Sequence, residues 1–338
     1  MPTIVLDAMG SDNHPQPELQ AAVEAAQKYG EEILLTGPEE ILLPKLKAMN
    51  ASRVRVVHAP EVFEMSEKIS PRVLRRAQNS MSVAMQLIKA GEADAFVTMG
   101  NTGGALAHGQ IILGRIRGVK RAALSALYPV KGGQCVVLDI GANVECRPEF
   151  LLQFAVMGAV YAQGVLGVEH PRVGLLSNGE EAGKGNDLVR ATYPLLEASG
   201  LNFIGNVEGK ELFGGEADVV VTDGFTGNIL TKGSEAVAKL LIDILREQLM
   251  SSFRTKMGAL LAKPAFGEIR KMLDPAEIGA APLLGIDGLV FVGHGRSNAR
   301  AVFSAIRLAR QAAEADLLSS IRGAIEERLK SQVREAVR

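Results

Sequence analysis

The sequence predicts an α/β fold built on a doubly wound, mostly parallel sheet. Short β-branched runs alternate with longer helical patterns from one end of the chain to the other. Several of these runs are apolar at consecutive positions, as in strands that helices cover on both faces. No repeat of about 20–50 residues interrupts the alternation, so right-handed crossovers between parallel strands are expected.

Nine segments are predicted as strands on this basis. In chain order they are 3–8, 32–37, 53–58, 95–99, 135–140, 172–177, 202–207, 218–223 and 289–293. We expect residues 1–338 to form a single catalytic unit, in which residues 230–280 form a helical hairpin.

The hairpin is predicted from a long helix over 235–257. Its apolar ladder comprises Val237, Leu241, Leu245, Leu249, Phe253 and Met257. Pro264 and the flanking glycines are expected to break the helix and to leave an apolar tip. The tip carries Leu260, Leu261, Ala265 and Phe266, with Arg254, Lys256, Lys263, Arg270 and Lys271 around it. One interpretation is a dimer-forming bundle with an ordinary surface tip; a second adds contact of the tip with an anionic membrane.

The composition is that of an ordinary globular protein. The chain has 47% hydrophobic and 22% charged residues and a net charge of -1, which argues against a general nucleic-acid binder. The first residues lack the basic region of a signal peptide, and no stretch of about 18 uncharged apolar residues is evident. Cys135 and Cys146 have no metal-ligand or disulfide-framework spacing. A cytoplasmic protein is the simplest expectation.

Five predicted strands run into short turns that carry glycine and asparagine. The turns are 99–104, 140–145, 177–181, 223–228 and 293–298. Small residues let backbone N–H groups approach a ligand, and a helix that begins after the turn favours an anion. Turn formation and helix capping are the better explanation of any single turn taken alone. Because ligands bind at the carboxyl ends of strands in α/β sheets, we expect the five turns to build one polar pocket at one sheet edge.

The segment NGEEAGKGN, residues 178–186, departs from a nucleotide-binding phosphate loop. Only three residues separate Gly179 from Gly183, and Gly185 stands where a Walker loop has Ser or Thr after the lysine. The chain also lacks a nucleophile elbow, and its histidines have no metal-ligand spacing. What remains is Lys184, His294, the asparagine turns, and five carboxylates: Asp7, Asp139, Glu180, Glu181 and Asp223.

This inventory suits a reaction in which a substrate supplies the nucleophile. Lys184 is a compact cation for an anionic substrate. Asparagine side chains and turn N–H groups can stabilise an oxyanion. His294 is expected to transfer a proton or donate a hydrogen bond, with capping of the following helix as the alternative. No metal and no cofactor are expected.

Seven segments together resemble one protein family. They are LDAMGSDNHP, ADAFVTMGNTGG, LDIGANVECRPEFLLQFAVMG, VGLLSNGEEAGKGN, NFIGNVEG, ADVVVTDGFTGNILTK, and APLLGIDG followed by GHGRSNA. The chain resembles the bacterial phosphate acyltransferases of phospholipid synthesis, also called acyl-ACP:phosphate transacylases, from residue 3 to about residue 310. Departures from the usual pattern are Ser11 for glycine, Ser177-Asn178 for Asn-Ile, and Thr226 for valine.

The resemblance implies transfer of a fatty acyl group from acyl carrier protein to inorganic phosphate. A membrane glycerol-3-phosphate acyltransferase then uses the acyl phosphate. The implied fold is like that of phosphotransacetylase and isopropylmalate dehydrogenase, and the implied assembly is a homodimer. With the hairpin tip, these partners favour a cytoplasmic protein associated peripherally with the inner face of the membrane.

The expected site combines the resemblance with the residue inventory. We expect phosphate to attack the thioester directly, with no covalent enzyme intermediate. The expected catalytic residues are Lys184, Asn228 and His294. The expected residues for binding phosphate and thioester are Asp7, Asn101, Thr102, Gly103, Asn143, Ser177, Asn178, Glu180, Asp223 and Gly227.

An acidic carrier protein requires a basic docking surface. Its expected residues are Arg115, Arg117, Lys120 and Arg121, and residues 70–76 are a second candidate. A solvated helix end explains these charges equally well. Two rival functions remain: a decarboxylating dehydrogenase of the isopropylmalate type, and a non-enzymatic scaffold that recruits lipid-synthesis partners to a membrane.

Overall fold

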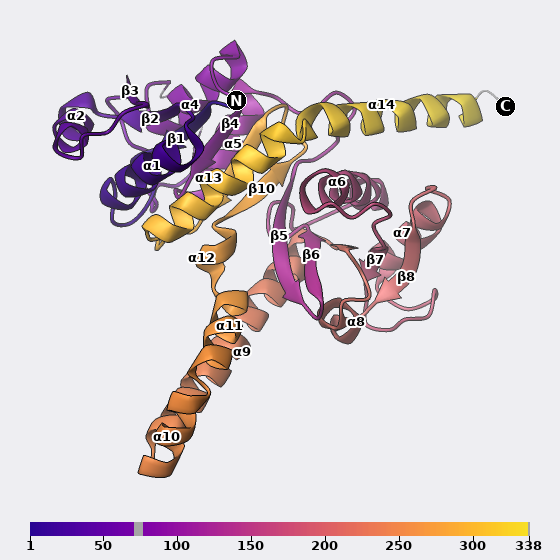
Figure 1. The fold of residues 1–338 in the computed structure, drawn as a ribbon. Coiled ribbons are helices and arrows are strands. Elements are labelled where there is room, and N and C mark those ends of the chain that lie inside the picture. Colours follow the sequence, from indigo (N-terminus) through magenta and orange to yellow (C-terminus); the bar gives the residue numbers. More distant parts are fainter. Residues whose placement is uncertain (71–76, 337–338) are drawn as a thin grey trace.

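The computed structural model describes residues 1–70 and 77–336, and in these ranges eleven strands form one mixed sheet (Figure 1). In chain order the strands are β1 (Ile4–Asp7), β2 (Ile33–Gly37), β3 (Val54–His58), β4 (Ala95–Thr98), β5 (Ala123–Val130), β6 (Gly133–Leu138), β7 (Val173–Leu176), β8 (Phe203–Val207), β9 (Val219–Val221), β10 (Ala280–Leu284) and β11 (Leu289–Gly293). Each of the nine predicted segments overlaps one of them. The predicted α/β class is confirmed.

Two strands, β5 and β10, were not predicted. Each contains a proline, Pro129 and Pro282 respectively, and both are rich in alanine, which is depleted in strands. They lie in the middle of the sheet, whose order is β3-β2-β1-β4-β11-β10-β5-β6-β9-β7-β8. These two strands therefore join an N-terminal lobe (β1–β4 and β11) to a C-terminal lobe (β6–β9).

The central strands reverse the direction of the sheet. β10 pairs antiparallel with β11 and with β5, and β5 pairs antiparallel with β6. Within each lobe the pairings are parallel. The strands of the two lobes therefore run in opposite directions, and their carboxyl ends lie at opposite edges. The expectation that all five turns share one edge is wrong.

Helices cover both faces of each lobe. They are α1 (Gln16–Tyr29), α2 (Glu39–Ala48), α4 (Ser80–Ala90), α5 (Thr102–Ile112), α6 (Pro148–Leu166), α7 (Asp187–Glu197), α8 (Gly209–Gly214), α12 (Pro275–Ile278), α13 (Ala299–Glu314) and α14 (Leu317–Ala336), apart from the hairpin helices. In the N-terminal lobe, α1 and α13 pack together on one face, while α4 and α5 pack together and against the strands. In the C-terminal lobe α6 and α7 pack together, and α8 contacts β5 and β8.

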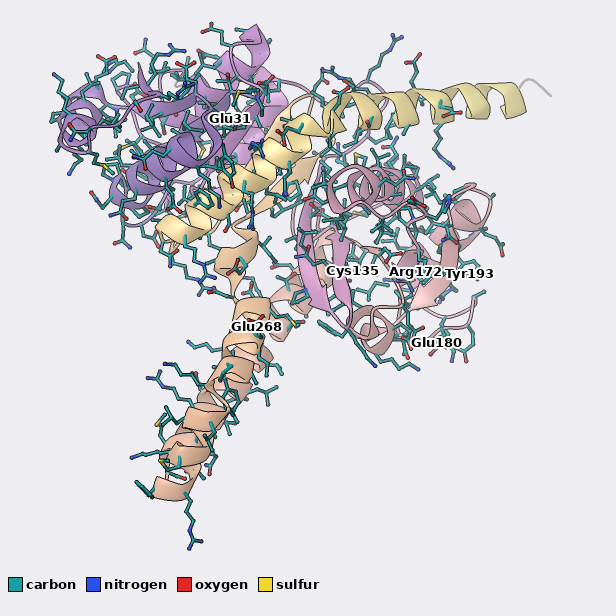
Figure 2. The ribbon with its side chains drawn as sticks, in the orientation of Figure 1. Glu31, Cys135, Arg172, Glu180, Tyr193 and Glu268 are labelled. Atoms are coloured by element: carbon teal, nitrogen blue, oxygen red, sulfur yellow. The ribbon has the colours of Figure 1, made fainter. Side chains whose placement is uncertain are left out.

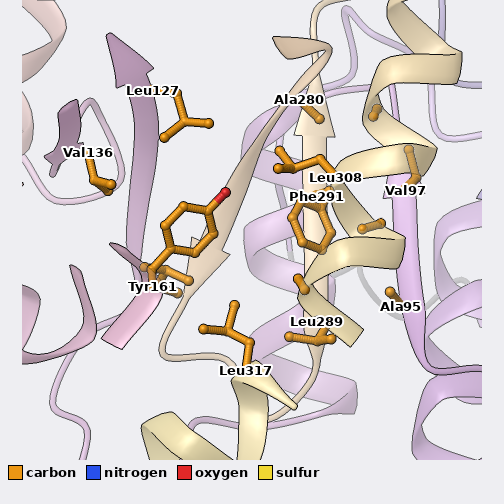
Figure 3. Packing of buried hydrophobic residues seen from close by; sticks show 14 of the residues in the cluster. Ala95, Val97, Leu127, Val136, Tyr161, Ala280, Leu289, Phe291, Leu308 and Leu317 are labelled. Carbon is orange, nitrogen blue, oxygen red and sulfur yellow. The ribbon is translucent and has the colours of Figure 1, made fainter. Parts of the chain in front are cut away.

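Alternate strand residues enter different cores. Ile4 and Leu6 belong to the largest hydrophobic cluster, whereas Val5 between them belongs to the cluster beneath α4 and α5. This follows from the period of two in a strand, and both faces are apolar because both are covered. The largest cluster extends through the central strands, where Phe291 and Tyr161 are buried (Figure 3).

One helix, α6, is long and apolar enough to cross a membrane by length and composition, so the expectation that no such stretch exists is wrong. Most of its 18-residue window is buried inside the protein, where it contacts α7 and α14. Its apolar residues therefore have partners within the fold. We assign it as a core helix.

The predicted hairpin is present and projects from the sheet (Figure 1). Its helices are α9 (Gly224–Met250), α10 (Phe253–Leu261) and α11 (Lys263–Leu273). The first break was misplaced: it falls after Met250, because Ser252 and Thr255 form a capping box that starts α10. Pro264 lies in the first turn of α11, where a missing N–H is tolerated.

The apolar face of the hairpin is exposed. Val237, Leu241, Leu245 and Phe253 of the predicted ladder are all exposed in the described structure. At the far end, Leu260 and Leu261 are exposed, whereas Phe266 is half-buried. The side chains of Arg270 and Lys271 lie outside the described part.

Candidate active site

The turns form two groups, one at each edge of the sheet. The turns after β6, β7 and β9 carry Asn143, Lys184 and Asn228 and lie together at the carboxyl edge of the C-terminal lobe. The turns after β4 and β11 carry Asn101 and His294 at the carboxyl edge of the N-terminal lobe. Two of the three expected catalytic residues thus share an edge, and His294 is on the other.

Asp139 organises the turn after β6. Its carboxylate accepts hydrogen bonds from the backbone N–H groups of Gly141, Ala142 and Asn143 at 3.1, 3.0 and 2.7 Å. Desolvation by burial raises the pKa of Asp139, and the hydrogen bonds from Ala142 and Asn143 oppose the shift. The Nδ2 atom of Asn143 also donates to Asp139 and to the Ala122 carbonyl, at 2.8 and 2.7 Å. The side-chain amide N–H groups of Asn143 therefore hold the turn.

The turn after β9 packs directly on this one. Asp223 caps α9 by accepting hydrogen bonds from the backbone N–H and the hydroxyl of Thr226, at 2.9 and 2.8 Å. The backbone N–H of Gly224 donates to the Asn143 carbonyl at 2.7 Å. A Cβ on Gly227 would lie 1.9 Å from the Asp139 carbonyl oxygen. Gly227 is therefore required for close contact between the two turns.

Asn228 has a different environment from Asn143. Its side chain is exposed, lies beside Gly141, and makes no hydrogen bond within the described residues. The neighbouring apolar side chains Val144, Phe225 and Ile229 are more than half exposed. An amide group thus stands at the surface among apolar side chains.

Lys184 lies on the exposed loop between β7 and α7. No ion pair to its ammonium group occurs in residues 1–70 or 77–336. A Cβ on Gly179 would lie 2.8 Å from its Cγ atom, so glycine makes room for the lysine stem. Gly185 has φ of +95°, which explains glycine at the position where a Walker loop has Ser or Thr.

The other expected residues of this loop have structural contacts. Asn178 Oδ1 accepts a hydrogen bond from the backbone N–H of Gly185 at 3.0 Å. The backbone N–H of Ser177 donates to the Val207 carbonyl at 2.9 Å, and its buried hydroxyl has no partner in the described structure. Glu180 forms an ion pair with Lys210 at 2.5 Å, beside α8 (Figure 2).

The N-terminal lobe holds its expected residues internally. Asp7 is buried and accepts a hydrogen bond from Thr98 at 2.8 Å, and desolvation by burial raises the pKa of Asp7. Asn101 caps α5 through Gly104 and donates to the Met65 carbonyl at 2.8 Å. A Cβ on Gly103 would lie 2.6 Å from the terminal Cδ1 atom of Ile69, so that side chain would have to move to admit one. Thr102, on the first turn of α5, is exposed.

A cavity of about 610 Å³ separates His294 from α9. Its basic residues include Lys232, Lys239 and Arg296, which sequence analysis missed. Lys232 stands four residues after Asn228, so the two share one helix face. That spacing was the available signal. The helix α9 therefore connects the two groups of turns.

The basic residues at 114–121 lie next to the turn after β6, since Asn143 bonds to the Ala122 carbonyl. Arg115, Arg117, Lys120 and Arg121 are all exposed. Arg115 donates to the Lys120 carbonyl, and Arg121 stacks over the Phe150 ring at 5.5 Å. The second candidate, 70–76, lies outside the described residues except for Ser70.

Neither cysteine is a thiolate at neutral pH. Burial raises the pKa of Cys135 to about 12 and, by desolvation, that of Cys146 to about 12. Cys135 lies inside β6 (Figure 2). Because the thiolate is the nucleophilic form, the environment disfavours both as nucleophiles.

Comparison with known proteins identifies the family. The profile of a family described as "Fatty acid synthesis protein" matches residues 2–320. A phosphate acyltransferase from Pelotomaculum thermopropionicum is 47% identical over 324 residues, covering 96% of this chain and 95% of the relative. Another from Thermus thermophilus is 48% identical over 320 residues, covering 94% and 97%.

Solved structures show the same fold at low identity. A phosphotransacetylase from Streptococcus pyogenes aligns with a TM-score of 0.61 at 15% identity, covering 93% of both chains. A putative 4-hydroxythreonine-4-phosphate dehydrogenase from Salmonella typhimurium aligns with a TM-score of 0.53 at 13% identity, covering 92% and 99%. The fold therefore does not separate transferase from dehydrogenase, but the sequence relatives do. The chain belongs to the bacterial phosphate acyltransferase family of fatty acid synthesis proteins and is an acyltransferase.

Proposed function

We propose that this enzyme transfers a fatty acyl group from acyl carrier protein to inorganic phosphate and so forms acyl phosphate for phospholipid synthesis. The observation that carries the proposal is the pair Lys184 and Asn228. Both lie at the carboxyl edge of the C-terminal lobe, both are exposed, and neither side chain has a hydrogen-bond or ion-pair partner among the described residues. Most of the polar side chains around them instead make hydrogen bonds that hold the turns in place.

In the proposed reaction Lys184 and the N–H groups of its loop bind the phosphate dianion. A phosphate oxygen attacks the thioester carbonyl, and Asn228 donates a hydrogen bond to the carbonyl oxygen as its negative charge develops. Asn143 keeps the neighbouring turn in place, and the apolar side chains around Asn228 contact the acyl chain. Positioning two reactants can lower a barrier by roughly 7–11 kcal/mol.

The carrier thiolate is the leaving group. Because a thiol has a pKa of about 8.5, its thiolate is a good leaving group even when no strong acid protonates it. His294 lines the cavity beside α9, and Asn228 is not part of that lining. We therefore assign His294 an assisting role. The raised pKa values of both cysteines support direct attack without an acyl-enzyme intermediate.

The proposal is tested with Lys184→Ala. Acyl phosphate formation from acyl carrier protein and phosphate is measured at varied concentrations of each substrate. The variant is expected to show a higher KM for phosphate and a lower kcat, with little change in the KM for the carrier. Wild-type kinetics would remove Lys184 from the site, and a competent acylated side chain would contradict direct attack.

The carrier protein is proposed to dock on Arg115, Arg117, Lys120 and Arg121. Their position beside the Asn143 turn supports this, because a docked carrier delivers its thioester next to Asn228. Reversing the charges of Arg115 and Arg117 should raise the KM for the carrier and flatten its salt dependence. A variant that keeps both properties of the wild type would rule out this surface.

A homodimer and a membrane contact are proposed for the hairpin. The exposed ladder on α9 is a surface that a second copy would cover. Leu260 and Leu261, near Lys256 and Lys263, suit an anionic bilayer, which would place this cytoplasmic enzyme at the inner face of the membrane near a glycerol-3-phosphate acyltransferase. Replacing both leucines by Asp should abolish sedimentation with anionic vesicles; unchanged sedimentation would exclude the tip.

A further inference from the structure

The loop that carries Lys184 is bordered by a second lysine, Lys210. Its ammonium group lies 2.5 Å from a carboxylate oxygen of Glu180, 3.2 Å from Glu211 and 3.7 Å from Glu208. Oxygen atoms of these three carboxylates lie within 4.8 Å of one another. Hydrogen bonds to Glu180 and Glu211 raise the pKa of Lys210, so it is cationic throughout the physiological range.

The three carboxylates differ in the hydrogen-bond partners that they have besides Lys210. Glu211 already accepts a hydrogen bond from the Glu208 backbone N–H at 2.9 Å, and both belong to the capping box of α8. The side chain of Glu180 is more than half exposed, and Lys210 is its only partner within residues 1–70 and 77–336. Glu180 is thus the carboxylate that depends on Lys210.

The same loop brings a further carboxylate close to Lys184. At Gly179, the position of a Cβ lies 2.8 Å from Lys184 Cγ and 3.2 Å from Glu181 Oε2, so both side chains border this glycine. Asn206 fixes the loop backbone by donating to the Glu181 carbonyl at 2.8 Å. Lys184 therefore stands on an anchored loop with two glutamates in a four-residue stretch before it.

A free Glu180 would compete with phosphate for Lys184. Its negative charge would lower the local potential that attracts a dianion, and its carboxylate would be available to pair with the Lys184 ammonium. An ion pair between Glu180 and Lys210 removes both of these effects of Glu180. The arrangement leaves Lys184 as the cation of this loop that has no internal partner in the described structure.

We propose that Lys210 is a positioning residue that holds Glu180 and so keeps Lys184 available to the phosphate substrate. The inference rests on the proposed role of Lys184 in phosphate binding. Lys210 itself does not touch phosphate. Its effect is exerted through the charge and position of Glu180.

The variant Lys210→Met tests the proposal without unfolding the protein. Exposed ion pairs contribute little to stability, so its melting temperature should stay close to that of the wild type. We expect its KM for phosphate to rise by up to about fivefold, the size that the loss of one exposed ion-pair interaction supports. The KM for acyl carrier protein should not change, and Lys210→Arg should retain wild-type kinetics.

A second substitution separates the proposed cause from simple loss of a contact. In Lys210→Met/Glu180→Gln the competing charge is gone, so the KM for phosphate should return toward the wild-type value. A double variant as impaired as Lys210→Met would overturn the proposal, as would an unchanged KM in Lys210→Met itself. Lys45→Met, which removes an exposed charge from α2 in the other lobe, controls for net charge.

Combination with Lys184→Ala distinguishes this inference from the proposed function. If Lys184 binds phosphate and Glu180 competes for it, Lys210→Met should raise the KM for phosphate by a smaller factor in the Lys184→Ala background than in the wild type, because only the direct charge effect of Glu180 remains. An impaired Lys184→Ala with a normal Lys210→Met would refute only the role of Lys210. A normal Lys184→Ala would refute the phosphate-binding role on which the inference depends.

Discussion

Replacing Gly227 by Ala should displace the start of α9 and with it Asn228. The added Cβ would lie 1.9 Å from the Asp139 carbonyl oxygen and 2.9 Å from the Asp139 carbonyl carbon. Side-chain Cβ atoms essentially never approach closer than 3.0 Å, so the separation must grow by about 1.1 Å. The atoms that obstruct this Cβ belong to the backbone of Asp139 and not to a flexible side chain. The carboxylate of Asp139 is in turn held by hydrogen bonds from its own turn.

A shift of this size has a large expected effect on catalysis. A misplacement of about 1 Å can cost about a hundredfold in rate, and overpacking costs about 1–3 kcal/mol of stability. We therefore expect kcat/KM for acyl phosphate formation to fall by about two orders of magnitude in Gly227→Ala, with a lower melting temperature. Steady-state kinetics and thermal unfolding measure the two effects.

The matched control is Gly233→Ala, which lies in the same helix. A Cβ at Gly233 meets no atom within 4 Å. Because alanine favours a helix over glycine by about 1 kcal/mol, this variant should be slightly more stable and equally active. If Gly227→Ala keeps kcat/KM within about threefold of this control, the close contact between the two turns does not position Asn228.

Three further predictions address stability and assembly. The Tyr161 hydroxyl is buried without a partner among the described atoms (Figure 3), so Tyr161→Phe should raise the free energy of unfolding by about 1 kcal/mol; a loss of stability would reveal a hidden partner. Burial acts to raise the pKa of Asp218, but the hydrogen bonds and charge of Arg172 hold it below the usual value. The stabilisation by ionised Asp218 is therefore present above about pH 4 and is lost as the pH falls through the folded-state pKa. The difference in melting temperature between the wild type and Asp218→Asn should accordingly shrink in acid. A difference that is constant with pH would show that the charge of Asp218 does not contribute. Leu241→Glu with Leu245→Glu should convert the proposed homodimer to a monomer in analytical ultracentrifugation, and a dimer mass in both the wild type and the variant would exclude this face.

Much of the fold could be predicted from the sequence because its signals are local. Consecutive apolar residues in β1, β6 and β9 indicate strands covered on both faces, and the structure places alternate residues in different cores. The hairpin followed from the spacing of apolar residues in α9. Its first break did not, because the capping box of Ser252 competes with the continuing apolar pattern.

The site was predicted in composition but not in arrangement. The asparagines of the five turns are chemically alike, and only their contacts distinguish them. Asn143 and Asn101 donate their amide N–H groups to backbone carbonyls of other segments, those of Ala122 and Met65, whereas Asn228 has no such bond within the described residues. Lys210 and Lys232 were missed because neither lies in a glycine-rich turn.

The sequence by itself determined the alternation of strands and helices, the polar turns after the strands, and membership in an acyltransferase family. The tertiary structure alone decided that the two lobes run in opposite directions, because this depends on the antiparallel pairing of β5 with β10, two strands that are distant in the chain. It also decided which polar groups have hydrogen-bond or ion-pair partners and which face solvent. Hydrogen bonds and ion pairs between distant residues leave no periodic trace in a sequence, so a side chain such as Lys184 can be recognised as available only once its neighbours are in place.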